Sequence, residues 1–142
     1  MLVYLCGPID QCGCSADIYN WRKLVKNKLN CSNFNVFDAA SAFSISNRRQ
    51  NFDELYLITK TALIKSNIIL AYIPPDMPTI GTFTELQTAK EYNIPVYIAM
   101  PNKLKDSMIL SALLSKNGKI FKFLNDAIET LITENKEGAS KK

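Results

Sequence analysis

The residues with the clearest chemical potential lie in one short segment, where a proline-rich loop gives way to a helix. Residues 79–85 combine a glycine, three hydroxyl side chains and a carboxylate. Backbone N–H groups and the dipole at a helix N-terminus favour an anion. Thr79, Gly81 and Thr82 are therefore candidates to hold a phosphate or a sugar hydroxyl. Glu85 lies on the first turn and is a candidate nucleophile facing the same crevice.

Glu85 also has a simpler interpretation. Thr82 and Glu85 have the spacing of a capping box, in which the carboxylate only satisfies backbone donors at the helix start. A capping Glu is exposed and ionised, whereas a nucleophilic Glu lies in a pocket. The two interpretations therefore predict different surroundings for one side chain.

A second candidate segment follows the first apolar strand and reads Cys6-Gly7-Pro8-Ile9-Asp10. A glycine directly after a strand lets the backbone turn and lets a ligand approach closely. The Asp10 side chain would then point into the crevice. The alternative is a tight turn that carries a solvated carboxylate.

The composition limits the chemistry further. The chain has 142 residues, 17 basic and 13 acidic side chains, four cysteines and no histidine. Without histidine, catalysis must use carboxylates, thiols, hydroxyls, amides or Lys and Arg. Cys12 and Cys14 resemble half a metal site, but a structural zinc needs four ligands, so we predict no metal.

The elements that must position these residues alternate between strand and helix. The apolar runs are short and lack alternation, which indicates strands buried on both faces of a parallel sheet. We predict an α/β fold: a single-domain Rossmann-like sandwich with a five-stranded, mainly parallel sheet flanked by helices. The expected strands are Leu2–Cys6, Phe34–Phe37, Ile68–Ile73, Pro95–Met100 and Ile120–Phe123; the expected helices are Asp17–Leu29, Asp53–Ser66, Thr82–Tyr92, Ser107–Leu114 and Asn125–Glu134.

The domain organisation is simple. Residues 1–135 are expected to form one domain, and residues 136–142 a flexible basic tail. No run approaches the length of a membrane span, and Met1–Cys6 has no basic residues before it and no cleavage site after it. We therefore expect a cytoplasmic protein with reduced thiols and no membrane partner.

Sheets of this type bind ligands beyond the carboxyl ends of their strands. The loops after the first three strands leave from that edge, and Asp38 begins the second of them. Phe43 in this loop is a candidate to pack on a ligand, whereas Trp21, Phe34 and Phe37 are expected in the core rather than as a platform for nucleic acid.

Four motifs in this order and spacing carry a resemblance, and a fifth is weaker. They are Val3–Asp10, the strand into Asp38-Ala39-Ala40, Ser66–Ala71, Gly81–Leu86 and, more weakly, Leu110–Leu113. With them the chain resembles the nucleoside 2-deoxyribosyltransferase family over about residues 2–123. That family includes 2'-deoxynucleoside 5'-monophosphate N-glycosidases and cytidylate hydrolases.

The resemblance implies the roles of individual residues. Glu85 would attack C1' of the sugar and form a glycosyl-enzyme ester. Asp10, Asp38 and Asp53 are the acids that could give a proton to the leaving base, and Asp10 is the best placed of them by its loop. The other implied residues contact the substrate: Tyr4, Gly7, Pro8, Ile9, Asp38, Phe43, Thr79, Gly81, Thr82 and Ser111. No cofactor is implied, and the implied partner is a second copy of the chain in a homodimer or larger homo-oligomer, with Ser111 reaching the neighbouring site.

The sequence departs from the family pattern at Asn67 and Thr59, where many members have aspartate. Thr79 and Ser111 favour a nucleoside monophosphate that is hydrolysed, since hydroxyls can donate to a phosphate. Pro8 and Asp10 favour a free nucleoside and therefore a base-exchanging transferase. A nucleotide-binding module that has lost catalysis is the alternative of another class.

Overall fold

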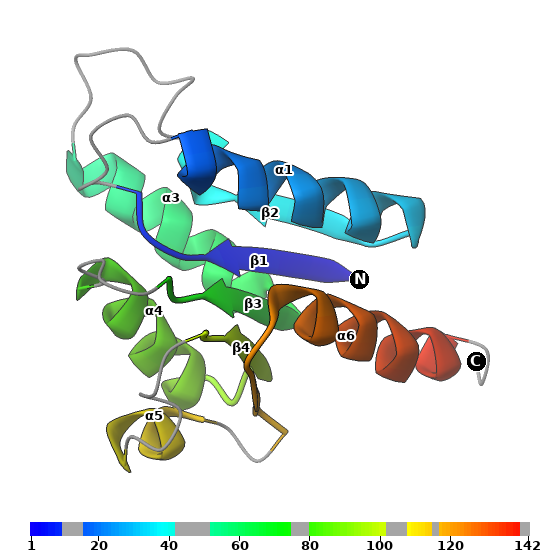
Figure 1. Cartoon of the computed structure of the whole chain (residues 1–142). Coiled ribbons are helices and arrows are strands. Elements are labelled where there is room, and N and C mark those ends of the chain that lie inside the picture. The colour runs from blue at the N-terminus through cyan, green and yellow to red at the C-terminus, as the bar shows by residue number, and fades with distance from the viewer. Residues whose placement is uncertain (10–15, 42–51, 75–79, 102–107, 115–116, 140–142) are drawn as a thin grey trace.

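Strands and helices alternate along the chain, as the apolar pattern predicts. The computed structural model describes residues 1–9, 16–41, 52–74, 80–101, 108–114 and 117–139 (Figure 1). Its strands are β1 (Leu2–Cys6), β2 (Asn35–Asp38), β3 (Ile68–Tyr72), β4 (Val96–Ala99) and β5 (Lys119–Phe121). Its helices are α1 (Ala16–Cys31), α3 (Phe52–Lys65), α4 (Ile80–Glu91), α5 (Met108–Leu113) and α6 (Leu124–Ala139).

The five strands form one sheet in the order β2-β1-β3-β4-β5, and every neighbouring pair is parallel. The predicted Rossmann-like α/β fold is therefore confirmed. The chain moves outward from β1 in one direction to β2 and in the other to β3, so the strand order reverses between β1 and β3. In open parallel sheets such a switch point marks the ligand crevice at the carboxyl ends of the strands.

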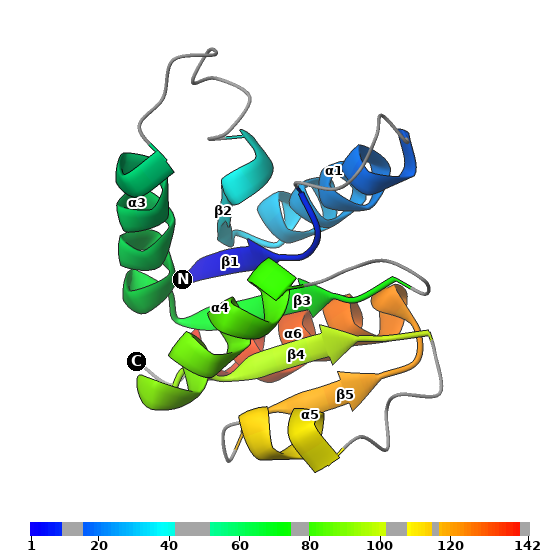
Figure 2. The same ribbon diagram turned by 90° about the vertical axis from the view of Figure 1, so that its left-hand side faces the viewer.

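Helices cover both faces of the sheet. α1 and α6 lie on one face, while α3 and α4 lie on the other and α5 packs beside α4 (Figures 1 and 2). Strand side chains alternate between the faces, so Val3 and Leu5 join the core under α1 and α6, whereas Tyr4 and Cys6 join the core under α3 and α4.

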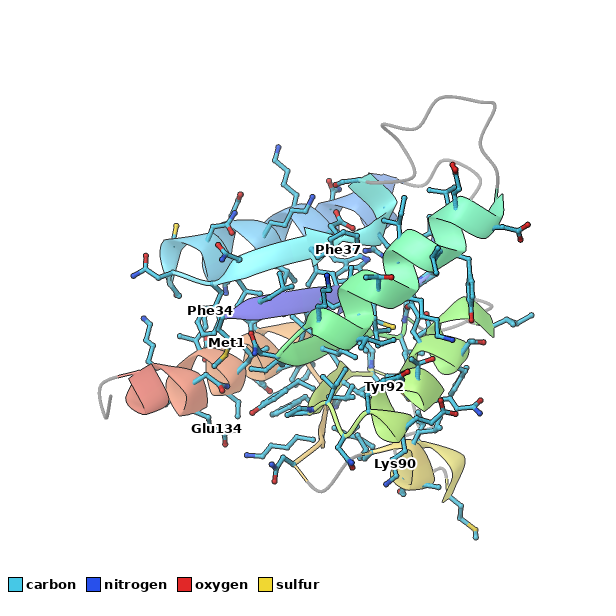
Figure 3. All side chains as sticks on the ribbon, turned by 180° about the vertical axis from the view of Figure 1, so that it is seen from behind. Met1, Phe34, Phe37, Lys90, Tyr92 and Glu134 are labelled. Atoms are coloured by element: carbon cyan, nitrogen blue, oxygen red, sulfur yellow. The ribbon has the colours of Figure 1, made fainter. Side chains whose placement is uncertain are left out.

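Two asparagines close α1 and α4, and a lysine on α4 holds α5 in place. Asn33 and Asn93 follow α1 and α4 with φ angles of 64° and 55°, the left-handed conformation that commonly closes a helix. The Lys90 ammonium near the end of α4 donates a hydrogen bond to the Leu114 carbonyl at 2.7 Å, which fastens α5 to α4. Figure 3 shows the molecule from behind, with Lys90 and Tyr92 labelled at the same end of α4.

Every helix limit differs from the expectation by at least one residue, and two of these differences bear on the site and on the expected tail. α4 begins at Ile80 rather than at Thr82, and α6 continues past Lys136, where we expected the flexible tail to begin, to Ala139. The second difference follows in part from composition, because Glu134, Lys136 and Glu137 are good helix formers that prolong the helix. No helix within the described ranges is long and apolar enough to cross a membrane.

Candidate active site at the carboxyl end of β1

The Glu85 carboxylate is held by two donors from the neighbouring strand. The Tyr4 hydroxyl donates to Oε1 of Glu85 at 2.5 Å, and the Cys6 thiol donates to Oε2 at 2.8 Å. Tyr4 and Cys6 are two residues apart on β1, so they point to the same face of the sheet and meet the first turns of α4. Glu85 is half-buried. This arrangement fixes a carboxylate next to the switch point of the sheet.

The surrounding core keeps both donors in place. The Tyr4 ring stacks on Phe37 of β2 with ring centroids 5.5 Å apart, and both Tyr4 and Cys6 are fully buried. The Cys6 sulfur also lies 3.8 Å from the Thr82 carbonyl of α4. Tyr4 therefore bridges two strands and the helix that carries the carboxylate.

Electrostatics keep the phenol and the thiol protonated. Burial raises the pKa of Tyr4 far above its usual range, and the negative charge of Glu85 raises it further. Burial also raises the pKa of the Cys6 thiol, again with a second contribution from Glu85. The Arg22 guanidinium opposes both shifts more weakly. At neutral pH both groups are thus neutral donors to one anionic carboxylate.

The start of α4 contradicts the capping interpretation. Because the helix begins at Ile80, Thr82 lies inside its first turn, and Glu85 bonds to β1 rather than serving only as a cap. Thr82 is buried, and its hydroxyl finds no hydrogen-bond partner among the described residues. Gly81 is exposed, and a Cβ added there would meet open space. Gly81 therefore leaves room at the helix N-terminus, whereas the Thr82 hydroxyl is enclosed by the protein.

Asp38 belongs to a second network, on the face of the sheet that α1 covers. Arg22 of α1 is buried, and its guanidinium donates to Asp38 Oδ1 at 2.7 Å and to the Gly7 carbonyl at 2.9 Å. Lys26, one turn further along α1, lies 2.6 Å from Asp38 Oδ2, and the Ser41 hydroxyl donates to the same oxygen at 2.9 Å. These bonds tie the end of β2 and the loop after β1 to one helix.

The ion pairs determine the charge state of Asp38. Burial alone would raise the pKa of its carboxyl, but the Lys26 hydrogen bond, the Arg22 charge and the Ser41 hydroxyl outweigh it and lower the pKa below its usual value. Asp38 is therefore an anchored anion. Its two cationic partners come from α1, whereas Glu85 is held on the opposite face, so the structure separates these two expected site residues.

Gly7 serves close packing. A Cβ at this position would lie 2.7 Å from Cζ2 of the Trp21 ring and 3.1 Å from the Tyr72 carbonyl. The φ angle of Gly7 is not positive, so steric room rather than backbone freedom requires glycine there. Pro8 is buried and Ile9 packs against the core under α3 and α4, which directs the loop over that face.

Comparison with known proteins gives the architecture a family context. No protein-family model and no curated protein sequence matches the chain. Solved structures do match. A 2-deoxyribosyltransferase from Bacillus psychrosaccharolyticus superposes with a TM-score of 0.72 at 16% identity, over 90% of each chain. A conserved protein from Enterococcus faecalis gives a TM-score of 0.73 at 13% identity, over 94% of this chain and 98% of the other.

A third match is the CMP N-glycosidase BcmB from Clostridium botulinum, with a TM-score of 0.66 at 14% identity, over 92% of this chain and 97% of the other. The chain has the nucleoside 2-deoxyribosyltransferase-like fold. The fold that the sequence motifs implied is thus confirmed, and it spans nearly all of the matched chains.

The two departures from the pattern of 2-deoxyribosyltransferase-like proteins have local roles. The Thr59 hydroxyl bonds to the Leu55 and Tyr56 carbonyls of its own helix, both at 3.0 Å. The Asn67 side chain accepts a hydrogen bond from the Leu2 backbone at 2.8 Å and so joins the amino ends of β1 and β3. Asn67 therefore lies at the edge of the sheet opposite to Glu85, and its amide contributes to strand alignment.

The remaining expected residues fall into two groups. Asp10, Phe43 and Thr79, together with the Cys12–Cys14 pair, lie outside the described residues. Ser111 is exposed on α5, which packs beside α4 rather than against β1. Of the expected site residues, the structure brings Tyr4 and Glu85 into direct contact.

Three residues of these networks escaped the sequence analysis. Cys6 has no role in the sequence analysis beyond its place in the first strand and loop motif, and Arg22 and Lys26 have none beyond their place in the expected helix Asp17–Leu29. The signals available were the two-residue spacing of Tyr4 and Cys6 on a strand and the four-residue spacing of the two cations on a helix. Both spacings place side chains on one face, but neither names the partner.

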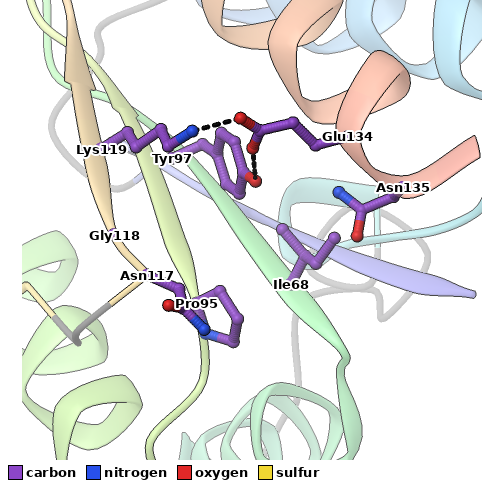
Figure 4. Close-up of a pocket in the computed structure, with 8 residues that line it drawn as sticks. All are labelled: Ile68, Pro95, Tyr97, Asn117, Gly118, Lys119, Glu134 and Asn135. Atoms are coloured by element: carbon purple, nitrogen blue, oxygen red, sulfur yellow. Dashed lines mark hydrogen bonds and ion pairs between the residues drawn. The ribbon is translucent and has the colours of Figure 1, made fainter. Parts of the chain in front are cut away.

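A pocket of about 350 Å³ lies at the other edge of the sheet, where β3, β4 and β5 begin (Figure 4). Glu134 accepts hydrogen bonds there from the Tyr97 hydroxyl at 2.6 Å and from the Lys119 ammonium. Burial and the Glu134 carboxylate raise the pKa of Tyr97 to about 12. These polar groups satisfy one another and stabilise the packing of α6, at the edge away from the switch point.

Proposed function

We propose that the protein cleaves the N-glycosidic bond of a nucleoside 5'-monophosphate, with Glu85 as nucleophile. The supporting observation is the clamped carboxylate: Tyr4 and Cys6 hold both oxygens of Glu85 at the carboxyl end of β1. A preorganised anion beside a sheet crevice has the position that a nucleophile needs to meet a sugar carbon.

The reaction then follows the two steps of a retaining glycosidase. In the first step a Glu85 oxygen forms a bond to C1' of the sugar while the C1'–N bond breaks, and the electron pair leaves with the base. The base takes a proton from an acid, a role that we assign to Asp10. In the second step water attacks C1', the bond between C1' and the Glu85 oxygen breaks, and the water proton passes to the Asp10 carboxylate, which yields a sugar 5-phosphate and restores both carboxyl groups.

The monophosphate preference rests on the start of α4. Its backbone N–H groups favour an anion there. Gly81 leaves space next to them. Thr79 and, from a second copy of the chain, Ser111 would add further hydroxyl donors to the phosphate.

The fold fits two other functions. The matched structures include a 2-deoxyribosyltransferase as well as an N-glycosidase, so exchange of bases on free deoxynucleosides is the second candidate. The back-bonded Thr59 hydroxyl supports a third, a nucleotide-binding module without catalysis, because it leaves the position without a carboxylate.

One assay separates the three functions. Purified protein is incubated with deoxynucleosides, ribonucleosides and their 5'-monophosphates, with and without an acceptor base, and free base and new nucleosides are quantified. Release of base from monophosphates without an acceptor supports the proposal. New nucleosides formed only with an acceptor support the transferase, and tight nucleotide binding by calorimetry without any base release supports the binding module.

A further inference from the structure

Glu85 receives a second hydrogen bond, from the Cys6 thiol, that a nucleophilic carboxylate does not by itself require. The Tyr4 hydroxyl bonds to Oε1, and the Cys6 thiol bonds to the other oxygen, Oε2, at 2.8 Å. With one donor, the carboxylate can turn about its last single bond. With a donor on each oxygen, the plane of the carboxylate is fixed relative to β1.

The thiol is suited to this task by its surroundings. Cys6 is fully buried in the core under α3 and α4, and burial together with the anionic carboxylate keeps its sulfur protonated. Its two acceptors are the Glu85 carboxylate and, at 3.8 Å, the Thr82 carbonyl of the same helix. The thiol donates to the nearer and charged acceptor, the Glu85 carboxylate, since charge-assisted hydrogen bonds are the stronger ones.

We propose that Cys6 is a positioning residue of the active site, which holds the Glu85 carboxylate in its reactive orientation through a thiol hydrogen bond. This inference rests on the proposed function of Glu85 as nucleophile. Cys6 acts through Glu85. It differs from a packing residue because its role depends on the S–H group that donates the hydrogen bond to Oε2.

Two substitutions distinguish a donor from a packing residue. Cys6→Ser keeps a donor of similar size, whereas Cys6→Ala removes it and leaves Oε2 without this hydrogen bond. If Cys6 positions the carboxylate, Cys6→Ala lowers kcat about tenfold with KM within about twofold, and Cys6→Ser retains most of the activity. If Cys6 only packs, the order is reversed, because a hydroxyl in an apolar site costs more than a methyl group. Cys31→Ala, at an exposed thiol, is the matched control.

The hydrogen bond itself is tested without turnover by the infrared S–H stretching band. The difference spectrum between the wild-type protein and Cys6→Ala isolates the Cys6 band from those of the other thiols. We expect this band at lower frequency in the wild-type protein than in Glu85→Gln, where the charged acceptor is lost. An identical band in both proteins, or equal kcat for Cys6→Ala and the wild-type protein, would overturn the inference. If the wild-type protein releases no base while the band still shifts, the proposed function has failed and the Cys6–Glu85 bond stands.

Discussion

At the scale of single residues, the hydrogen bond from the Tyr4 hydroxyl is the shorter of the two that β1 donates to Glu85, at 2.5 Å against 2.8 Å for the Cys6 thiol. Tyr4→Phe keeps the ring and its stacking on Phe37 and deletes only the donor. A hydrogen bond to a charged group contributes about 1.5–3 kcal/mol, so the free energy of unfolding should fall by about that amount. The rate of base release should fall by at least about tenfold. Urea titration and initial-rate assays measure the two effects, and a variant with full activity would remove Tyr4 from the site.

Glu85→Gln tests the nucleophile. The amide is nearly isosteric and still accepts a hydrogen bond from Tyr4, so the circular dichroism spectrum should resemble that of the wild-type protein. Base release should be abolished, because the amide forms no ester with C1'. Glu91→Gln, an exposed carboxylate at the other end of the same helix, is the control and should retain activity. Turnover of Glu85→Gln at the wild-type rate would exclude covalent catalysis by this residue.

The ion pairs of Asp38 should make part of the free energy of unfolding depend on acid pH. Its pKa in the folded protein lies below the ordinary value of 3.8. The unfolded chain therefore binds the proton first as the pH falls, so the ion pairs stabilise the fold fully above about pH 3.8 and lose their effect as the pH falls through the lower folded value.

Asp38→Asn should remove this pH-dependent part of the stability and lower the free energy of unfolding at neutral pH. The buried Arg22 guanidinium would lose its carboxylate, and breaking such a pair costs about 3–5 kcal/mol. Unfolding free energies measured from pH 7 to pH 2 should start lower in the variant and decline less steeply below pH 4. Glu129→Gln, at an exposed carboxylate of α6, serves as the control. Parallel curves for Asp38→Asn and the wild-type protein would contradict the ion-pair account.

At the scale of elements, two glycines at the carboxyl edge of the sheet differ in their surroundings. Gly7→Ala places a Cβ 2.7 Å from the Trp21 ring and should lower the free energy of unfolding by about 1–3 kcal/mol. Gly81→Ala meets open space on the first turn of α4 and should raise it by about 0.5 kcal/mol. If the phosphate approaches the backbone at Gly81, the same substitution raises KM for the monophosphate more than for the nucleoside. Urea titration measures the free energy of unfolding of both variants. A Gly81→Ala variant less stable than Gly7→Ala would contradict the packing at these two glycines.

The elements themselves were predictable from sequence because their signals are local. Five apolar runs of strand length and the amphipathic periods between them gave the observed order of strands and helices. Helix limits were less predictable. Thr82 has the chemistry of an N-cap, yet α4 begins at Ile80.

The networks of the site were not predictable to the same degree, because they join residues far apart in the chain. Tyr4 and Glu85 are separated by 81 positions and meet only once β1 and α4 are packed. Arg22 stands among the lysines of an amphipathic helix, and nothing local distinguishes the one cation that is buried. Residue types and a family resemblance selected Glu85 and Tyr4, whereas the partners of Asp38 and the role of Cys6 required the fold.

At the scale of the whole molecule, apolar surface is distributed unevenly. Nine large apolar side chains are strongly exposed among the described residues, and six of them belong to α3, α4, α5 or the residue after α4. They are Tyr56, Leu57, Ile58, Ile80, Tyr92 and Met108. The other three are Met1, Leu24 of α1 and Phe123, which directly precedes α6. An apolar surface concentrated on one side favours association with another protein surface.

We therefore propose that the face of α3, α4 and α5 joins a second copy of the chain. Met108 is 87% exposed on the six-residue helix α5, where Leu110 is buried and Ser111 faces outward. A stable interface of about 800 Å² per partner would cover these side chains and bring Ser111 to the neighbouring molecule.

The prediction is a dimer at micromolar concentration that dissociates when the apolar face receives a charge. Met108→Glu should shift the mass measured by light scattering toward that of the monomer, because a carboxylate buried in an apolar interface is unpaired. Leu24→Glu, on the opposite face, should leave the dimer intact. If Ser111 serves the neighbouring site, Met108→Glu also raises KM for the monophosphate, and higher protein concentration restores it. A monomeric wild-type protein would disprove the shared site and leave the phosphate to the donors at the start of α4.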